Sequence, residues 1–276
     1  MLINAVPQWQ GALGPRAQEL PEGCAALAEL AGRVLGRPVC HVRQSGETSP
    51  VAGGIANREV LLANRPAQLA ALEAPGGPVL TVGGDCGTEL VPIGVARYRY
   101  GPGLGVLWFD AHPDLNTARS SPSGAYHGMV LRSLLGEGDP DFAANPALER
   151  GRAVLAGTRS FDDPEREAAE SGLVTVVPDA TDAAALAAAL RGAEHVYLHV
   201  DLDILDPGEF GGLNYPEPDG LSIAELVAAI DALVGFDVVG AGVTECAGTE
   251  GLEVLEPVLA AIGRRLGAAG PHTARG

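Results

Sequence analysis

The chain has 276 residues, 46% of them hydrophobic, and a formal net charge of −17. A chain this long and this apolar can bury a large core as one domain. The strong negative charge argues against nucleic acid or an anionic membrane as a partner, because phosphate contacts require clustered Lys and Arg.

Apolar runs bounded by Gly and Pro predict eight strands that alternate with helices along the chain. The expected strands cover about 2–6, 39–42, 78–82, 105–107, 153–156, 174–177, 196–198 and 238–243. Helices are expected over about 17–35, 55–72, 88–98, 182–190 and 252–266, with others that end at 135, begin near 162 and begin after 222. This alternation predicts either a parallel sheet covered on both faces or a closed eight-stranded barrel, and periodicity alone leaves both open.

We expect one domain over residues 1–276, because no linker or internal repeat interrupts this pattern. Residues 267–276 are predicted to form a flexible tail. No signal peptide is visible at the start of the chain and no apolar run is long enough to span a bilayer, so a cytoplasmic location is expected. The four cysteines lie far apart without a Cys-x-x-Cys pair, which argues against a disulfide framework.

Three potential metal ligands, spaced by two residues, follow the apolar run at 105–107. They are Asp110, His112 and Asp114. In an extended backbone, alternate side chains point to the same side. Two carboxylates around one imidazole suit a hard or borderline divalent ion, and suit Mn²⁺ better than Ca²⁺ or a structural Zn²⁺. Taken alone, the triplet is equally compatible with a polar strand end followed by a solvated loop.

A second acidic cluster follows the apolar run at 196–198, where Asp201 and Asp203 are again two residues apart. Buried carboxylates this close together are tolerated only where a cation pairs them. A metal ion is the simplest such cation. The two clusters together therefore predict a metal site at the ends of two strands.

Five motifs occur in the order found in the ureohydrolase family, which comprises arginases, agmatinases and their relatives. They are Gly83-Gly84-Asp85, Asp110-Ala111-His112-Pro113-Asp114, His127-Gly128, Asp201-x-Asp203-x-x-Asp206-Pro207 and a late strand-end Glu245. The chain resembles this family over about residues 80–250. The resemblance implies a three-layer α/β/α arginase-like fold with a mainly parallel eight-stranded sheet, and therefore a sheet rather than a barrel. It also implies a binuclear Mn²⁺ centre that hydrolyses a guanidinium group to a urea-type product and an amine.

The resemblance further implies six metal ligands, namely Cys86, Asp110, His112, Asp114, Asp201 and Asp203. Asp110 and Asp201 would bridge the two ions. His112 and Asp203 would complete the second site, while Asp114 and the residue at position 86 would complete the first. Two ions held in this way activate a water molecule at neutral pH.

Three residues are expected to be catalytic by the same resemblance: His127, Glu245 and Asp114. His127 would lie near the leaving amine as a proton shuttle, because an imidazole titrates near neutrality. Glu245 would hold the guanidinium by charge-assisted hydrogen bonds.

Cys86 departs from the family pattern, which has His after Gly-Gly-Asp. A thiolate is a soft ligand, whereas Mn²⁺ prefers oxygen and imidazole, so the first site is expected to hold its ion weakly. A buried, unligated cysteine is the alternative. A degenerate protein would also explain a lost ligand, but the other matching positions are intact.

The matching positions also predict how a substrate would bind. Asn116 and Ser123 would receive the α-carboxylate of a guanidino amino acid. Its α-amino group would go to Asp162, or to Asp163 if the register is one residue later. Ala125 replaces an Asn that usually helps to hold the carboxylate.

With a cysteine at this ligand position, the chain resembles the amidinohydrolases that act on Nω-hydroxy-L-arginine in D-cycloserine biosynthesis. We therefore expect Mn²⁺-dependent hydrolysis of Nω-hydroxy-L-arginine to hydroxyurea and L-ornithine, a step of antibiotic biosynthesis. An arginase or another guanidino-acid hydrolase is the alternative within the enzyme class. A non-catalytic sensor of a guanidino metabolite is the alternative outside it. The expected partner is a small guanidino amino acid, and a homo-oligomer is compatible with the resemblance.

Overall fold

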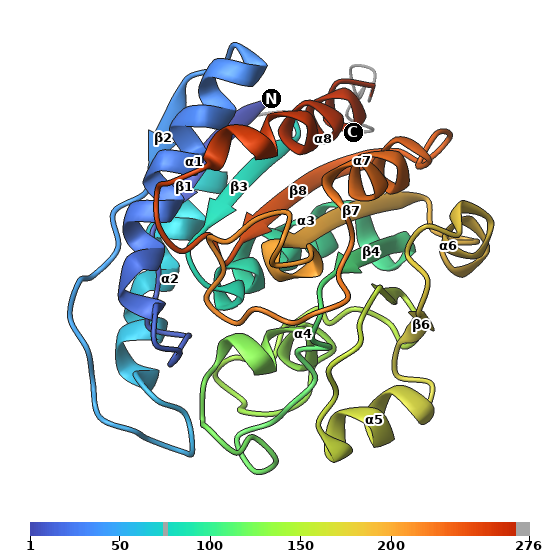
Figure 1. Cartoon of the computed structure of the whole chain (residues 1–276). Helices are drawn as coiled ribbons and strands as arrows, with labels where there is room; N and C mark the ends of the chain where they lie inside the picture. Colours follow the sequence, from blue (N-terminus) through green and yellow to red (C-terminus); the bar gives the residue numbers. More distant parts are fainter. Residues whose placement is uncertain (74–76, 269–276) are drawn as a thin grey trace.

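An eight-stranded sheet forms the centre of the computed structural model, which describes residues 1–73 and 77–268 (Figure 1). The strands are β1 (Leu2–Val6), β2 (Val39–His41), β3 (Val79–Gly83), β4 (Leu104–Phe109), β5 (Ala153–Ala156), β6 (Thr175–Val177), β7 (His195–Asp201) and β8 (Val238–Thr244). They lie in the order β2-β1-β3-β8-β7-β4-β5-β6, and all neighbouring pairs are parallel. Since β2 and β6 form two edges, the sheet is open, and the prediction of a sheet rather than a barrel is confirmed.

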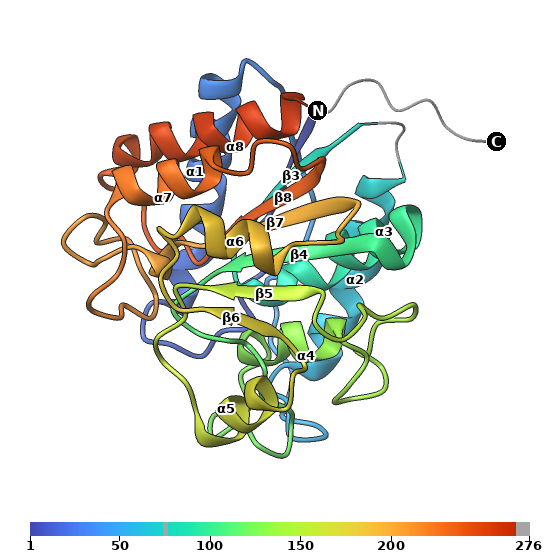
Figure 2. The ribbon, with the colours of Figure 1, turned by 90° about the vertical axis from the view of Figure 1, so that its right-hand side faces the viewer.

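Helices cover both faces of this sheet (Figure 2). One face packs against α1 (Leu20–Leu35), α6 (Ala183–Ala189), α7 (Ile223–Asp231) and α8 (Glu256–Ala268). The other packs against α2 (Arg58–Leu72), α3 (Leu90–Tyr100), α4 (Val130–Leu134) and α5 (Asp163–Glu170). This is the three-layer α/β/α arrangement that the resemblance implied.

Alternation along the central strands separates two apolar cores. On β4, Leu107 and Phe109 belong to the core beneath α1, α7 and α8, whereas Val106 and Trp108 belong to the core beneath α3 and α4. Every residue of β4 is buried. A strand covered on both faces has no exposed side, which is why its sequence is a continuous apolar run.

The strand ends that carry the acidic motifs meet at one edge of the sheet. Parallel strands place their carboxyl ends together, and the register pairs Phe109 of β4 with Val200 of β7. The acids that follow these two residues, Asp110 and Asp201, are therefore neighbours. Asp201 in turn pairs with Thr244 of β8, which brings the next part of β8 to the same edge.

Several helices begin slightly later than predicted. The helix expected from 17 begins at Leu20 and the helix expected from 252 begins at Glu256, each after a 3-10 turn. The helix expected from 55 begins at Arg58, and the helix expected from 88 begins at Leu90, after a 3-10 turn over Cys86–Glu89. Of the expected tail, residues 267 and 268 belong to α8, and the others lie outside the described residues. Among the described residues, no helix combines the length and the hydropathy needed to cross a membrane.

Candidate active site

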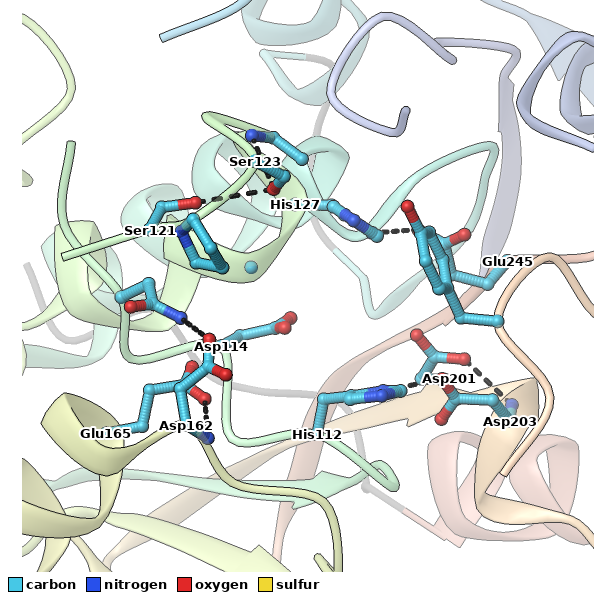
Figure 3. Close-up of a pocket in the computed structure, with 15 residues that line it drawn as sticks. His112, Asp114, Ser121, Ser123, His127, Asp162, Glu165, Asp201, Asp203 and Glu245 are labelled. Atoms are coloured by element: carbon cyan, nitrogen blue, oxygen red, sulfur yellow. Dashed lines mark hydrogen bonds and ion pairs between the residues drawn. The ribbon is translucent and has the colours of Figure 1, made fainter. Parts of the chain in front are cut away.

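A pocket of about 250 Å³, lined mostly by polar residues, opens at the edge where the strand ends meet (Figure 3). Its lining includes these predicted site residues: His112, Asp114, Asn116, Ser123, His127, Asp162, Asp201, Asp203 and Glu245. The other two, Cys86 and Asp110, are buried behind that lining, with exposed fractions of 1% and 0%. The fold thus gathers the whole predicted set in one region.

Asp110 follows β4 and is oriented by two hydrogen bonds. The indole Nε1–H of Trp108 donates to its Oδ2 at 2.9 Å, and the backbone N–H of His112 donates to its Oδ1 at 2.6 Å. Trp108 lies two residues earlier, so alternation directs both side chains to the same face of the sheet. A carboxylate oxygen accepts more than one bond, so both oxygens retain a lone pair for a further ligand.

The acids at the end of β7 are tied to those that follow β4. Asp201 Oδ1 accepts the backbone N–H of Asp203 at 2.8 Å, and Asp203 Oδ1 accepts the backbone N–H of Ala111 at 3.0 Å. Asp203 Oδ2 lies 2.9 Å from His112 Nδ1. Burial alone would raise the pKa of Asp203, but the adjacent His112 outweighs this and lowers it below the ordinary carboxyl value.

The thiol of Cys86 points at the end of β7. Its Sγ lies 2.9 Å from Asp201 Oδ2 and 3.0 Å from Thr244 Oγ1. Burial, followed by the carboxylate of Asp201, raises the pKa of this thiol well above its ordinary value. The surroundings of the sulfur are therefore polar and acidic on the side that faces the pocket.

Three groups of side chains in the described residues bring potential ligand atoms within 4.8 Å of one another. They are Asp110 with His112 and Asp203, Cys86 with Asp201 and Glu245, and Cys86 with Asp110 and His199. The first group matches the predicted second metal site together with a bridging acid. Asp114 belongs to none of the three groups, and His199 was not among the predicted ligands.

Asp114 nevertheless has the properties of an unpaired ligand. Its φ of 52° lies in the left-handed region, which non-glycine residues adopt rarely and mostly where the surrounding structure imposes it. Its Oδ2 is buried and has no hydrogen-bond partner among the described residues. Burial and the nearby Asp110 raise its pKa well above the ordinary carboxyl value.

The donors fit the divalent metal centre expected from the sequence. Burial and the neighbouring Asp203 raise the pKa of Asp110 to about 6, and the same two causes raise that of Asp201 well above the ordinary value. These shifts express the free energy of crowding buried carboxylates without a cation. Several carboxylates around one imidazole are the donors that hard and borderline divalent ions prefer.

Another wall of the pocket carries a contact between Glu245, which is buried, and His127, which is partly exposed. His127 Nδ1 lies 3.0 Å from Glu245 Oε1, and Asn214 Nδ2 donates to Oε2 at 3.2 Å. Burial lowers the pKa of His127, but Glu245 more than offsets this and raises it above the ordinary value. Glu245 has a left-handed φ of 63°, and its N–H donates to the Gly84 carbonyl at 2.7 Å. This backbone geometry directs the carboxylate into the pocket.

The outer wall carries the residues predicted to hold an amino-acid end group. Asn116 Nδ2 donates to Asp162 Oδ2 at 2.9 Å, and Ser123 Oγ accepts the backbone N–H of Ala125 at 3.1 Å. Asp162 lines the pocket, whereas Asp163 is the first residue of α5 and lies outside the lining. The geometry therefore favours the register that assigns Asp162.

Sequence reasoning missed three residues around the pocket. Glu165 accepts the backbone N–H of Leu115 through Oε1 at 3.0 Å and that of Asp162 through Oε2 at 3.0 Å, although its sequence context indicates only a helix start. Tyr215 lies in a Gly/Pro-rich loop without a motif, and its ring is 5.3 Å from that of His127. His199 falls inside a buried strand, where an imidazole normally indicates a satisfied core residue.

Comparison with known proteins points to one family. The model of the Arginase family matches residues 35–252. The Nω-hydroxy-L-arginine amidinohydrolase of Streptomyces lavendulae is 32% identical over 263 residues, which cover 92% of each chain. The arginase of Bacillus caldovelox is 32% identical over 174 residues, 58% of each chain. The crystal structure of arginase from Bacillus cereus, at 24% identity, has a TM-score of 0.81 over 96% of this chain and 97% of that one, a likeness in fold.

Proposed function

We propose that this chain, which belongs to the arginase family, hydrolyses Nω-hydroxy-L-arginine to hydroxyurea and L-ornithine with the help of Mn²⁺. The coarser class, a hydrolase of carbon–nitrogen bonds in linear amidines, follows from that membership. The finer assignment names the substrate and the metal. It would make the reaction a step of antibiotic biosynthesis.

The observation that carries the substrate assignment is the thiol of Cys86 within the donor cluster, 2.9 Å from Asp201 Oδ2. A thiolate weakens the hold on Mn²⁺ at the first site. An N-hydroxyguanidine carries an oxygen that competes for metal. It would therefore inhibit an enzyme that holds both Mn²⁺ ions tightly. A first site that does not hold Mn²⁺ tightly would instead allow the same group to bind productively.

A bound pair of divalent ions supplies an activated water at neutral pH and stabilises negative charge as the C–N bond is broken. Glu245 binds the guanidinium through its carboxylate, which is held in place by Asn214 and by the main chain of Cys86. His127 lies beside Glu245 and delivers a proton to the leaving amine of ornithine. The pKa of His127, raised by Glu245, favours the protonated form of the imidazole, which is the form that a proton donor requires.

The other end of the substrate is recognised as an α-amino acid. Asn116 and Ser123 donate to the carboxylate, and Asp162 accepts from the ammonium. Asn116 already donates to Asp162 at 2.9 Å, so the two side chains share one corner of the pocket. An analogue that lacks the α-carboxylate, such as agmatine, would lose the contacts with Asn116 and Ser123 and bind more weakly.

The test compares turnover of Nω-hydroxy-L-arginine, L-arginine and agmatine on the Mn²⁺-loaded protein, with the released urea-type product quantified. Nω-hydroxy-L-arginine should have the highest kcat/KM, and agmatine, which lacks the carboxylate, the lowest. If arginine is turned over fastest and the hydroxylated compound inhibits, the chain is an arginase. Binding of any of the three without turnover would instead favour a sensor.

A further inference from the structure

A fully buried imidazole lies directly behind the thiol of Cys86. His199 is 0% exposed, and its Nε2 lies 3.6 Å from Cys86 Sγ. A ligand atom of Asp110 completes the group, with all three atoms within 4.8 Å of one another. Around one tetrahedral ion, metal–sulfur bonds of about 2.3 Å and metal–nitrogen bonds of about 2.0 Å separate sulfur from nitrogen by about 3.5 Å. The observed separation is therefore suited to two ligands of one ion.

Packing holds the ring of His199 in one orientation. The ring stacks on Trp108 with centroids 3.5 Å apart and an interplanar angle of 23°. The sheet register pairs these two residues across β4 and β7. The two ring nitrogens face different side chains, Nε2 that of Cys86 and Nδ1 that of Glu89.

Glu89 occupies the position behind the imidazole. It is 0% exposed, and its Oε2 lies 3.5 Å from His199 Nδ1, yet neither atom has a hydrogen-bond partner among the described residues. Gly242 on β8 makes room for this carboxylate, since a Cβ there would lie 2.2 Å from Glu89 Oε1. Metal-binding histidines usually present their second nitrogen to a carboxylate, which orients the ring and selects the tautomer.

We propose that His199 binds the first metal ion together with Cys86 and Asp110, so that an imidazole from β7 replaces the one missing at position 86. A thiolate, an imidazole and a carboxylate suit Zn²⁺ better than Mn²⁺. The second site, which contains His112 and Asp203, has only imidazole and carboxylate ligands and suits Mn²⁺. The centre therefore holds two different ions, and Glu89 is a positioning residue for His199. This inference rests on the metal centre of the proposed function and changes the ion at its first site. The weak hold argued above concerns Mn²⁺, whereas Zn²⁺ is the ion that these three ligands suit.

The test measures metal binding in the absence of substrate. Its result can therefore contradict the proposed metal ligands while the proposed hydrolysis remains supported, and a lack of turnover would not by itself contradict the ligands. The metal-free protein is titrated with Co²⁺, whose coordination by a thiolate gives a charge-transfer absorption band in the near ultraviolet. X-ray absorption is then recorded with one equivalent of Zn²⁺. The wild type should show a sulfur shell at about 2.3 Å together with an imidazole nitrogen shell at about 2.0 Å.

His199→Gln removes the proposed ligand and should weaken Zn²⁺ binding about 100-fold, with loss of the imidazole shell. Glu89→Gln removes only the second partner of the ring and should weaken it about 10-fold. His195→Gln is the matched control, because it removes a histidine from the other end of the same strand. Its Zn²⁺ affinity and spectra should equal those of the wild type.

An unchanged Zn²⁺ affinity and unchanged spectra in His199→Gln would show that His199 is a packing residue, and the proposal would be wrong. If that variant does not fold, the X-ray absorption and Co²⁺ spectra of the wild type test the proposal instead. A first equivalent of Zn²⁺ that has a sulfur shell but no imidazole shell contradicts the proposal. A Co²⁺ complex without the thiolate band does so as well.

Discussion

The backbone N–H of Cys86 donates a hydrogen bond to Glu245 Oε1 at 3.0 Å. The bond ties the turn after β3 to the end of β8, and it uses only the main chain of Cys86. A substitution at position 86 therefore changes the metal donor while the contact that holds the guanidinium-binding carboxylate remains. This makes Cys86 a position where metal chemistry can be altered separately from substrate capture.

With Mn²⁺ as the only metal, Cys86→His should raise the metal retained after dialysis, because imidazole suits Mn²⁺ better than sulfur does. The tighter pair should favour plain arginine, so the ratio of turnover on Nω-hydroxy-L-arginine to turnover on arginine should fall. Cys40→His, at an exposed cysteine of β2, is the control. A ratio that stays the same while metal content rises would limit Cys86 to metal retention, and substrate choice would then rest on Asn116, Ser123 and Asp162.

The wild type, loaded with Mn²⁺ alone and then dialysed, should retain clearly fewer than two ions per chain. The reason is that the second site has oxygen and imidazole donors, whereas the first relies on the thiol of Cys86. Elemental analysis measures the ratio. A chelator should abolish activity, and so should Asp110→Asn or Asp201→Asn, since each acid is expected to serve both ions. Two tightly held Mn²⁺ ions would contradict the prediction.

Glu245→Gln should lower kcat/KM by the equivalent of about 2–5 kcal/mol, because the guanidinium would enter a buried pocket without its counter-charge. Steady-state kinetics on Nω-hydroxy-L-arginine measure the loss. Glu250→Gln, at an exposed acid five residues later, should leave the kinetics unchanged. A Glu245 variant with wild-type kcat/KM would show that this residue does not bind the guanidinium.

His127→Ala should lower kcat much more than it changes KM, because proton delivery to the leaving amine belongs to the chemical step. The same substitution at His41, an exposed histidine of β2, provides the control. If KM rises while kcat stays constant, His127 contributes to substrate binding and another group delivers the proton.

Glu165 should make the stability of the metal-free protein depend on pH. Burial raises its pKa from the ordinary value of 4.5 to about 7 in the folded state. Between these values the folded protein binds more protons than the unfolded chain, so the free energy of unfolding should fall as pH rises from about 4.5 to 7, by up to about 3 kcal/mol. Urea denaturation at several pH values measures the slope.

Glu165→Gln removes this titration and should reduce the slope, whatever constant offset the lost hydrogen bond introduces. Glu167→Gln, on the exposed side of the same helix, should retain the wild-type slope. An unchanged slope in Glu165→Gln would assign the pH dependence to the metal-binding carboxylates instead.

The sequence by itself predicted the parts of the site that depend on the direction of the strands. Asp110 and Asp201 each follow a buried apolar run, and parallel strands place such ends at one edge whatever their order. Spacing by two then brings His112 and Asp203 to the same cluster, as their 2.9 Å contact confirms. The open sheet came from the family resemblance, because alternation of strands and helices is shared with the barrel.

Only the tertiary structure decided which side chains from distant segments face one another. His199 lies inside the apolar run of β7, so its sequence context predicts a core residue, and Glu89 precedes α3 without any motif. The register of β4 with β7 stacks His199 on Trp108, and the turn after β3 carries Cys86 and Glu89 to either side of that ring. Periodicity records which face of a strand is buried. Strand order and register depend on how the two cores pack. Strand order and register in turn determine which side chain lies next to each buried polar group.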